Sequence, residues 1–267
     1  MIALSDKTDL WLKHIAGDAQ LTNLHGTHPI YEAVELNEKA TEILSTFGNQ
    51  TFSAIVGFVD MRGFSTAAAG KTPVEVKQLV EPFVSAVVDA AQKYDCFIDK
   101  TIGDEVMIVM PEFGQDAELS DARLSTRGLL VVDATALLHN VMRRLEALGL
   151  PYRLSAGMAF GSLLLSRVGT TAYGEWTVYG NTVNAAKRLQ SRAGKSASDD
   201  AHLLALGAIV QEQPKFGAHL RSLLHEIVPC GGGPIIFENA DVQTESMKGV
   251  GDVVFVASAI RSRPECP

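Results

Sequence analysis

The chain has 267 residues, of which 46% are hydrophobic and 20% are charged, and its formal net charge at pH 7 is −8. This composition is typical of a globular chain with a substantial core, and it excludes an intrinsically disordered protein. The acidic balance disfavours binding to nucleic acid, whose phosphate backbone it repels, but it is compatible with a small polyanion held by metal ions.

The cysteine pattern and the N-terminus indicate a reducing, aqueous compartment. Three cysteines without a Cys-x-x-Cys spacing indicate free thiols rather than a disulfide framework. The first residues reach charge at Asp6 and Lys7 without a long apolar core, unlike a signal peptide. The most apolar stretch, residues 129–142, contains Asp133 and His139 and is too short and too polar to span a bilayer. We therefore expect a cytoplasmic protein that binds neither a membrane nor nucleic acid.

In chain order, residues 1–50 are expected to form a helical N-terminal lead-in, because apolar residues recur there at roughly helical spacing. The main domain is expected to extend over residues 51–267. Its first element is a buried strand over residues 52–60, an apolar run rich in β-formers that ends at Arg62 and Gly63.

The elements that follow are predicted from apolar spacing and from Pro and Gly residues at the element ends. They are a helix over 73–94, a hairpin over 96–110, a loop over 111–127, a helix over 129–148, strands over 152–165 and 176–179, a helix over 182–192 and a strand over 253–257. This order predicts an α/β (α+β) sandwich in which helices cover one face of a mostly antiparallel sheet.

Two aspartates stand at predicted strand ends, close to glycines. Asp60 closes the first strand, and Asp104 follows Gly103 in the hairpin. Carboxylate oxygens suit hard cations such as Mg²⁺ and Mn²⁺, and a pair of such ions about 3.5–4 Å apart serves phosphoryl transfer. Each aspartate taken alone is more typical of an ordinary turn.

The predicted helix over residues 182–192 carries a second polar pattern. Asn181 or Thr182 can cap this helix, which places Asn184 and Arg188 one turn apart on the same face. An amide and a guanidinium in that arrangement can orient a ribose and neutralise a developing phosphoryl charge. A capped, solvated helix without a ligand explains the same pattern equally well.

Three segments together resemble, in order and spacing, the signature segments of the class III nucleotidyl cyclases. They are FVDMRGFS at 58–65, KTIGD at 100–104 and VYGNTVNAAKR at 178–188. The segment MKGVG at 247–251 is similar to that family's closing segment, so the resemblance covers about residues 51–260. It implies a ferredoxin-like core, a catalytic domain over residues 51–267, and conversion of a nucleoside triphosphate to a 3′,5′-cyclic nucleotide and pyrophosphate.

The resemblance also implies a metal site and two catalytic side chains. Asp60 and Asp104 match the metal-binding aspartates, and Met61 lies beside them in the metal site. Asn184 matches the asparagine that orients the ribose, and Arg188 matches the arginine that stabilises the transition state. Two divalent ions, Mn²⁺ or Mg²⁺, are the implied cofactors.

The substrate-binding positions follow from the same resemblance. They are the turn Met61, Arg62, Gly63 and Phe64, whose backbone meets the triphosphate, the base-reading positions Lys100 and Thr177, and Lys248, which reaches the terminal phosphates. In this family one chain supplies the aspartates and the other supplies Lys100, Asn184 and Arg188. A chain that carries all of these positions is expected to form a homodimer with two equivalent sites.

The base-reading positions leave two bases open. Many adenylate cyclases pair the lysine with an aspartate, where this chain has Thr177, and the glutamate–cysteine pair of guanine-type enzymes is absent. Lys100 can only donate, which suits N1 of adenine or O4 of uracil. Thr177 can donate or accept, which suits the amino group of adenine or N3–H of uracil.

The organisation of the chain favours UTP. A compact cyclase with only a short helical lead-in resembles the bacterial pyrimidine cyclases of anti-phage defence. We therefore expect cyclic UMP as the product, read by a separate effector protein. The alternatives are an adenylate cyclase that makes cyclic AMP from ATP, and a catalytically silent dimer that binds a nucleotide.

Overall fold

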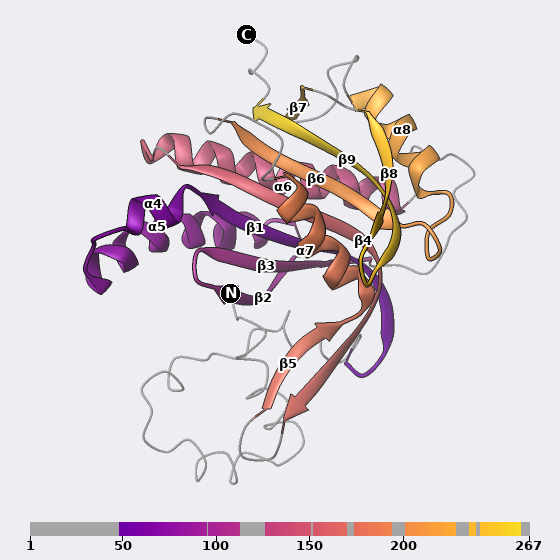
Figure 1. Ribbon diagram of the computed structural model, residues 1–267, viewed down its shortest axis with the longest axis horizontal. Helices are drawn as coiled ribbons and strands as arrows, with labels where there is room; N and C mark the ends of the chain where they lie inside the picture. Colours follow the sequence, from indigo (N-terminus) through magenta and orange to yellow (C-terminus); the bar gives the residue numbers. More distant parts are fainter. Residues whose placement is uncertain are drawn as a thin grey trace.

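The computed structural model of the chain describes residues 48–94, 96–112, 126–150, 152–169, 174–193, 201–227, 235–238 and 241–262 (Figure 1). Almost all of the predicted helical lead-in and most of the predicted loop over residues 111–127 lie outside the described residues. Among the helices that are described, none is both long and apolar enough to cross a bilayer.

A nine-stranded sheet forms the centre of the described part of the chain. Its strands are β1 (Thr51–Arg62), β2 (Phe97–Ile102), β3 (Glu105–Pro111), β4 (Arg153–Gly169), β5 (Gly174–Tyr179), β6 (His202–Ile209), β7 (Ile235–Phe237), β8 (Val242–Met247) and β9 (Gly251–Ser262). The order across the sheet is β2-β3-β1-β4-β6-β9-β7, with β5 paired to β4 and β8 paired to β9. Strands β4 and β6 run parallel and the other pairs are antiparallel, which confirms the predicted mostly antiparallel sheet.

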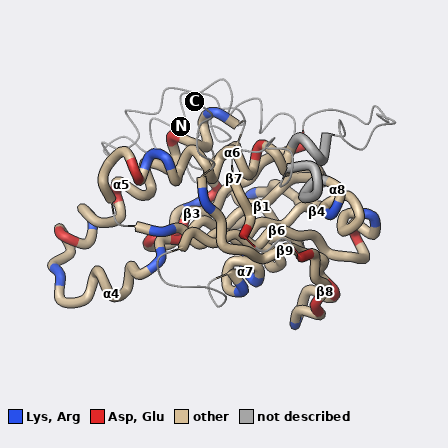
Figure 2. The backbone as a smooth tube through the Cα atoms, turned by 90° about the horizontal axis from the view of Figure 1, so that it is seen from above, with Lys and Arg blue, Asp and Glu red and all other residues tan. Residues whose placement is uncertain are grey.

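Helices cover both faces of this sheet, so the prediction that they cover one face is wrong. The helices are α4 (Phe64–Ala68), α5 (Pro73–Ala91), α6 (Thr126–Ala147), α7 (Asn181–Ala193) and α8 (Phe216–Ile227). Figure 2 shows α5 and α6 above the sheet and α7 below it, on the same side as β8. The physical reason is visible in β1, where Ile55 and Val59 pack with α5 and α6 while Val56 and Phe58 pack with α7. Both faces of the central strands are apolar, and both therefore need a cover.

Local sequence signals set the start of α5. Thr72 forms a capping box with Glu75, in which the hydroxyl accepts from the Glu75 N–H and the Glu75 carboxylate accepts from the Thr72 N–H. Pro73 at the first helical position needs no hydrogen-bond acceptor for its nitrogen. The predicted helix over residues 73–94 is confirmed with an earlier end.

Helix α7 lies unusually close to the sheet at Gly157 of β4. A Cβ atom added to Gly157 would overlap the backbone nitrogen of Gln190 and the backbone oxygen of Ala186, both in α7. A glycine at this position therefore lets the helix backbone rest directly on the strand. This close packing fixes the height of α7 above the sheet, and with it the positions of the polar side chains that α7 carries.

Candidate active site

The two predicted metal-binding aspartates lie together at one end of β1. Asp60 is paired in register with Glu105 at the start of β3, and Asp104 occupies the turn between β2 and β3. Burial, the neighbouring carboxylates of Asp104 and Glu105, and a side-chain hydrogen bond between Asp60 and Asp104 together raise the pKa of Asp60 to about 7. The structure therefore brings together the two carboxylates that the sequence singled out, and it adds a third.

Two side chains of α7 reach this acidic group within the same chain. The Gln190 Nε2 atom donates to the Asp60 Oδ2 atom at 3.0 Å. The Lys187 Nζ atom donates to the carboxylate of Glu105 and lies 5.3 Å from the centre of the Phe58 ring. Lys187 lowers the pKa of Asp60, but that pKa stays raised. One ammonium group therefore offsets the charge of the three carboxylates only in part. Sequence reasoning missed Lys187 and Gln190, although both fall inside the segment 178–188 or just beyond it.

The donor set fits a divalent metal ion. Carboxylate oxygens are hard ligands, and mutual repulsion of the kind seen at Asp60 is relieved when a cation lies between the carboxylates. Among the described residues no group of three or more His, Cys, Asp or Glu side chains could hold a metal ion by itself. Further ligands would therefore come from backbone, water or substrate phosphates, as is usual for Mg²⁺. The Met61 side chain is buried in the core under α5 and α6, so only its backbone could contribute.

Metal-free protein is expected to show the cost of these carboxylates as a pH dependence of stability. Between pH 4 and 7 the folded state keeps a proton on Asp60 that the unfolded chain has lost, so stability falls as pH rises through this window. Asp60→Asn removes the charge and is expected to stabilise chelator-treated protein at pH 8, by on the order of 1–3 kcal/mol. This advantage should shrink steadily as the pH is lowered towards 5.

Urea denaturation of both proteins at pH 5, 6.5 and 8 measures this difference. Added Mn²⁺ should stabilise the wild-type protein at pH 8 and should leave Asp60→Asn almost unchanged. A difference between the two proteins that does not vary with pH would contradict the repulsion described here.

The turn after β1 contains a glycine in a left-handed conformation. Gly63 has φ 79°, in the left-handed region that favours glycine, and it precedes the short helix α4 that begins at Phe64. The Arg62 guanidinium donates to the Ala201 carbonyl oxygen at 3.0 Å, on the strand side of the turn. The predicted contact of residues 61–64 with a triphosphate thus concerns their backbone, and it stays a prediction.

The two positions predicted to read the base, Lys100 and Thr177, are joined by a residue that the sequence analysis did not single out. The Thr177 hydroxyl donates to the Asp99 Oδ2 atom at 2.8 Å, and the Lys100 Nζ atom lies 3.6 Å from the same oxygen. Asp99 also accepts from the Val178 N–H at 3.2 Å, and it is fully buried. The structure therefore brings Lys100 and Thr177 to one place. A carboxylate directly after the apolar pair Phe97 and Ile98 in a predicted strand was the signal that could have revealed Asp99.

Asn184 and Arg188 form no hydrogen bond or ion pair with the described aspartates of their own chain. Both are exposed on α7, and in the part of the chain that the structure describes neither makes a hydrogen bond or an ion pair. Lys187 and Gln190 occupy the side of α7 that faces Asp60. The helix thus presents one polar face to its own acidic group and another to its surroundings.

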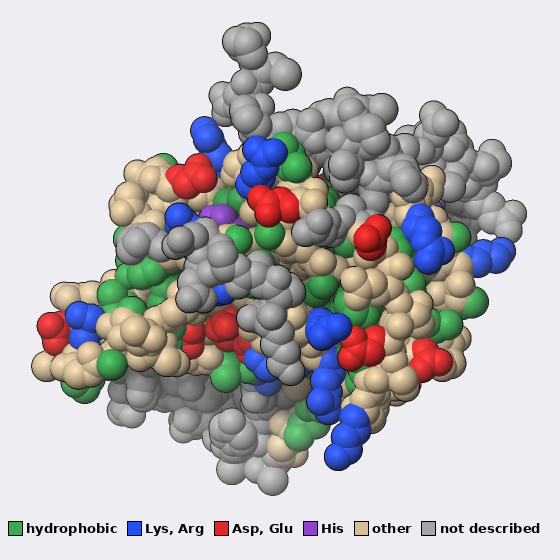
Figure 3. All heavy atoms as spheres, turned by 45° about the horizontal axis from the view of Figure 1, so that its top comes forward, with side chains coloured by type: hydrophobic (Ala, Val, Ile, Leu, Met, Phe, Trp, Pro, Cys, Tyr) green, Lys and Arg blue, Asp and Glu red, His purple; other side chains and the backbone are tan. Residues whose placement is uncertain are grey.

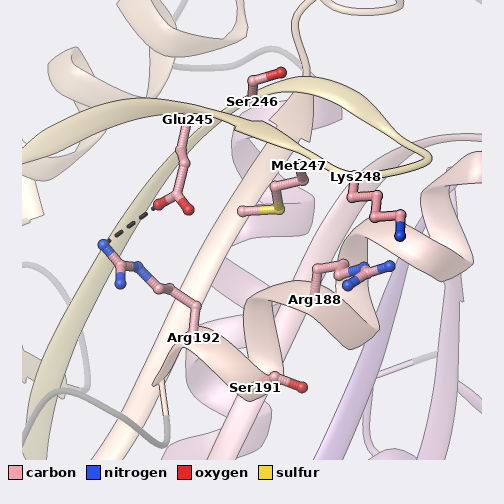
Figure 4. Close-up of a pocket in the computed structure, with 7 residues that line it drawn as sticks. All are labelled: Arg188, Ser191, Arg192, Glu245, Ser246, Met247 and Lys248. Carbon is pink, nitrogen blue, oxygen red and sulfur yellow. Dashed lines mark ion pairs between the residues drawn. The ribbon is translucent and has the colours of Figure 1, made fainter.

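A surface pocket joins the exposed face of α7 to the β8–β9 turn. Its lining residues are Arg188, Ser191, Arg192, Glu245, Ser246, Met247 and Lys248. Figure 4 shows the Arg188 and Lys248 side chains pointing towards the same space, while Arg192 pairs with Glu245 at 3.3 Å and ties β8 to α7. Within the described ranges neither Arg188 nor Lys248 forms an ion pair, and two such cations in one pocket suit phosphate oxygens. Figure 3 shows acidic and basic side chains interspersed at several places over this face of the molecule.

Comparison with known proteins gives a family match and distant relatives. Residues 49–198 match the family described as "Adenylate and Guanylate cyclase catalytic domain". The chain is 33% identical over 142 residues to an adenylate cyclase of Streptomyces coelicolor, covering 53% of this chain and 30% of that protein. It is 30% identical over 165 residues to the receptor-type guanylate cyclase gcy-23 of Caenorhabditis elegans, covering 61% of this chain and 14% of that protein. The chain therefore spans less than a third of the length of these relatives.

Among solved structures, the fold is similar to that of the adenylyl cyclase CyaB from P. aeruginosa. The TM-score is 0.53 at 19% sequence identity, and the match covers 82% of this chain and 98% of that one. At this identity the likeness concerns the fold, and it confirms the predicted ferredoxin-like cyclase core.

Proposed function

Since the chain belongs to the adenylate and guanylate cyclase catalytic domain family, we propose that it converts a nucleoside triphosphate to a 3′,5′-cyclic nucleotide and pyrophosphate between two copies of itself. The single observation that carries this proposal is the double orientation of α7. Gln190 binds Asp60 within the chain, whereas Asn184 and Arg188 are exposed on the surface of α7. The acidic group of one chain and the exposed α7 face of a second chain would together complete each site.

The site residues divide the chemistry among them. When bound by Asp60, Asp104 and the Met61 backbone, two divalent ions would lower the pKa of the ribose 3′-hydroxyl and offset charge on the pyrophosphate. The 3′ oxygen attacks the α-phosphorus, the bond from that phosphorus to the bridging oxygen breaks, and the hydroxyl proton passes to solvent. Asn184 orients the ribose, and Arg188 offsets the charge that develops on the α-phosphoryl oxygens.

The pocket beside α7 supplies the remaining contact. Lys248 shares this pocket with Arg188, so a triphosphate that reaches Arg188 with its α-phosphate can reach Lys248 with its terminal phosphates. The backbone of the turn at Gly63 would face the phosphates from the other side of the interface.

For the base, we propose UTP, with ATP as the second candidate. Lys100 and Thr177 fit the hydrogen-bonding edges of both. The matched relatives that are named adenylate cyclases favour ATP. With UTP the product would be cyclic UMP, which would act in anti-phage defence through a separate effector protein.

Incubation with each of the four ribonucleoside triphosphates and Mn²⁺, followed by identification of the product, tests this proposal. We expect pyrophosphate release with a cyclic nucleotide as the matching product, and a loss of turnover by on the order of 10²–10³-fold in Asp60→Asn. A dominant cyclic AMP product would remove cyclic UMP and the defence role. Nucleotide binding without turnover of any of the four would identify a silent binding dimer instead.

A further inference from the structure

We propose that Asp99 is a positioning residue that fixes which hydrogen bond each base-reading side chain can make, and so determines base specificity. The inference rests on the proposed function and goes beyond it, because it assigns a role to a residue that never touches the substrate. With Asp99 in this role, the site selects a base by the order of hydrogen-bond donor and acceptor on its edge.

The Asp99 carboxylate contacts both base-reading side chains. Its Oδ2 atom lies 2.8 Å from the Thr177 hydroxyl oxygen and 3.6 Å from the Lys100 Nζ atom. Its Oδ1 atom accepts from the backbone N–H of Val178 at 3.2 Å. The carboxylate is therefore held from two strands, β2 and β5, and each of its oxygens is engaged.

Asp99 limits the hydrogen bonds that the Thr177 hydroxyl can make. A carboxylate can only accept, so the single hydroxyl hydrogen of Thr177 is used by Asp99. The hydroxyl then has only lone pairs to offer to a ligand. Lys100 can only donate. The pair therefore presents one acceptor and one donor in a fixed arrangement, and the freedom that an isolated threonine has is gone.

The burial of the Asp99 carboxylate carries a cost in free energy. Asp99 is fully buried, and its neighbours Phe97 and Ile98 in β2 are buried and apolar. Burying a carboxylate costs free energy that an apolar side chain would not, unless its hydrogen bonds and ion pair offset it. A neutral or apolar side chain at position 99 could join β5 to β2. The carboxylate does more, because it contacts both base-reading side chains, Thr177 and Lys100.

A fixed donor and acceptor sort the bases by the order of groups on their edges. Adenine and cytosine carry a donor on the exocyclic nitrogen and an acceptor on the ring nitrogen, whereas guanine, hypoxanthine and uracil carry the reverse order. A site in which Thr177 faces the exocyclic group accepts the first order, and a site in which it faces the ring accepts the second. Ring size then separates purines from pyrimidines.

This rule is tested on the wild-type protein with two size-matched pairs, ATP against inosine triphosphate and CTP against UTP. We expect the same edge order to win in both pairs, by about tenfold or more in kcat/KM. Opposite preferences in the two pairs would overturn the proposal. If the protein turned over none of these nucleotides, the proposed function would fail, and displacement of a fluorescent nucleotide would then give the same comparison of edge orders.

The variant Asp99→Asn tests the residue itself. The amide would accept from Val178 N–H with its oxygen and donate to Thr177 with its nitrogen, which turns the Thr177 hydrogen towards the ligand. We expect both preferences to collapse by about tenfold, through a higher KM for the preferred nucleotide and with kcat largely kept. Thr177→Val should lose the same preferences, and the double variant should lose no more.

Asp89→Asn, an exposed aspartate on α5, is the matched control and should keep both preferences. Thermal melting of every variant separates loss of folding from loss of discrimination. Equal losses with all nucleotides, with both preferences unchanged in Asp99→Asn, would show that Asp99 serves only to join the strands.

Discussion

Mixing the Asp60→Asn and Arg188→Ala variants is expected to restore a turnover that neither variant shows alone. In the proposed mechanism each substitution removes a group that acts on charge in the transition state, so each homodimer should lose turnover by on the order of 10²–10³-fold. In a heterodimer the two defects fall in the same site, and the other site keeps Asp60 from one chain and Arg188 from the other. Random exchange of subunits would give about one half heterodimers, and therefore about one quarter of the wild-type turnover.

The structure offers a matched control for this experiment. Asp104→Asn removes a carboxylate from the same acidic group as Asp60. In a heterodimer of Asp60→Asn and Asp104→Asn each site has one damaged acidic group, so mixing should restore nothing. No recovery in the first mixture, when heterodimers are shown by mass spectrometry, would place all of the catalytic groups within one chain. Recovery in the control would mean that Asp60 and Asp104 serve different sites.

Gly157→Ala is expected to reduce stability and turnover together. The new methyl group would overlap backbone atoms of Gln190 and Ala186, and backbone cannot rotate away as a side chain can. The helix α7 would have to move off the sheet, at a cost of about 2–4 kcal/mol. Its movement would pull Gln190 from Asp60 and displace Arg188, and a misplacement of about 1 Å can lower turnover by about 10²-fold.

Gly57→Ala is the control for this substitution, since it adds the same methyl group one residue away in the sheet register. There the closest atom is the Ile108 Cγ1 atom at 2.9 Å, followed by side-chain atoms that can shift, on the face that α5 and α6 cover. Urea denaturation and steady-state turnover of both variants measure the contrast. Wild-type turnover by a fully folded Gly157→Ala would contradict the role of this close packing.

Much of the fold was predictable because periodic segments carry their own signal. The helix predicted over residues 182–192 runs over Asn181–Ala193, and the helix predicted over 129–148 runs over Thr126–Ala147. Strand β6 was missed, since HLLALGAI has no alternation of polar and apolar residues. It is buried along its whole length between β4 and β9, and a strand covered on both faces shows no period of two.

Strand β8 and helix α8 were missed for different reasons. The residues of β8 are mostly polar and exposed, and this strand forms by pairing with β9 rather than by burying a face. The apolar stripe of α8, which includes Phe216 and Leu220, packs with the core on the α5 and α6 side. A short amphipathic helix of this kind is easily lost among loops in a single sequence.

The candidate site was predictable where a residue type alone defines the chemistry. Asp60 and Asp104 are close together as expected, and Arg188 shares a pocket with Lys248. The partners of these residues were not predictable, because Gln190 and Asp99 act through contacts between residues 130 and 78 positions apart in the chain. Such contacts depend on strand register and helix height, which no local pattern encodes.

The pairing of β1 has a consequence for how the protein would lose the proposed activity. Every residue of β1 from Thr51 to Arg62 is in register with β4, and a slip of one position would turn Asp60 to the opposite face. The end of β1 that carries Asp60 therefore cannot detach from the sheet while the rest of the molecule stays folded. We expect the amide hydrogens of β1 to exchange only through global unfolding. Gentle heating should therefore lower the fraction of folded molecules, while each molecule that stays folded keeps its full turnover.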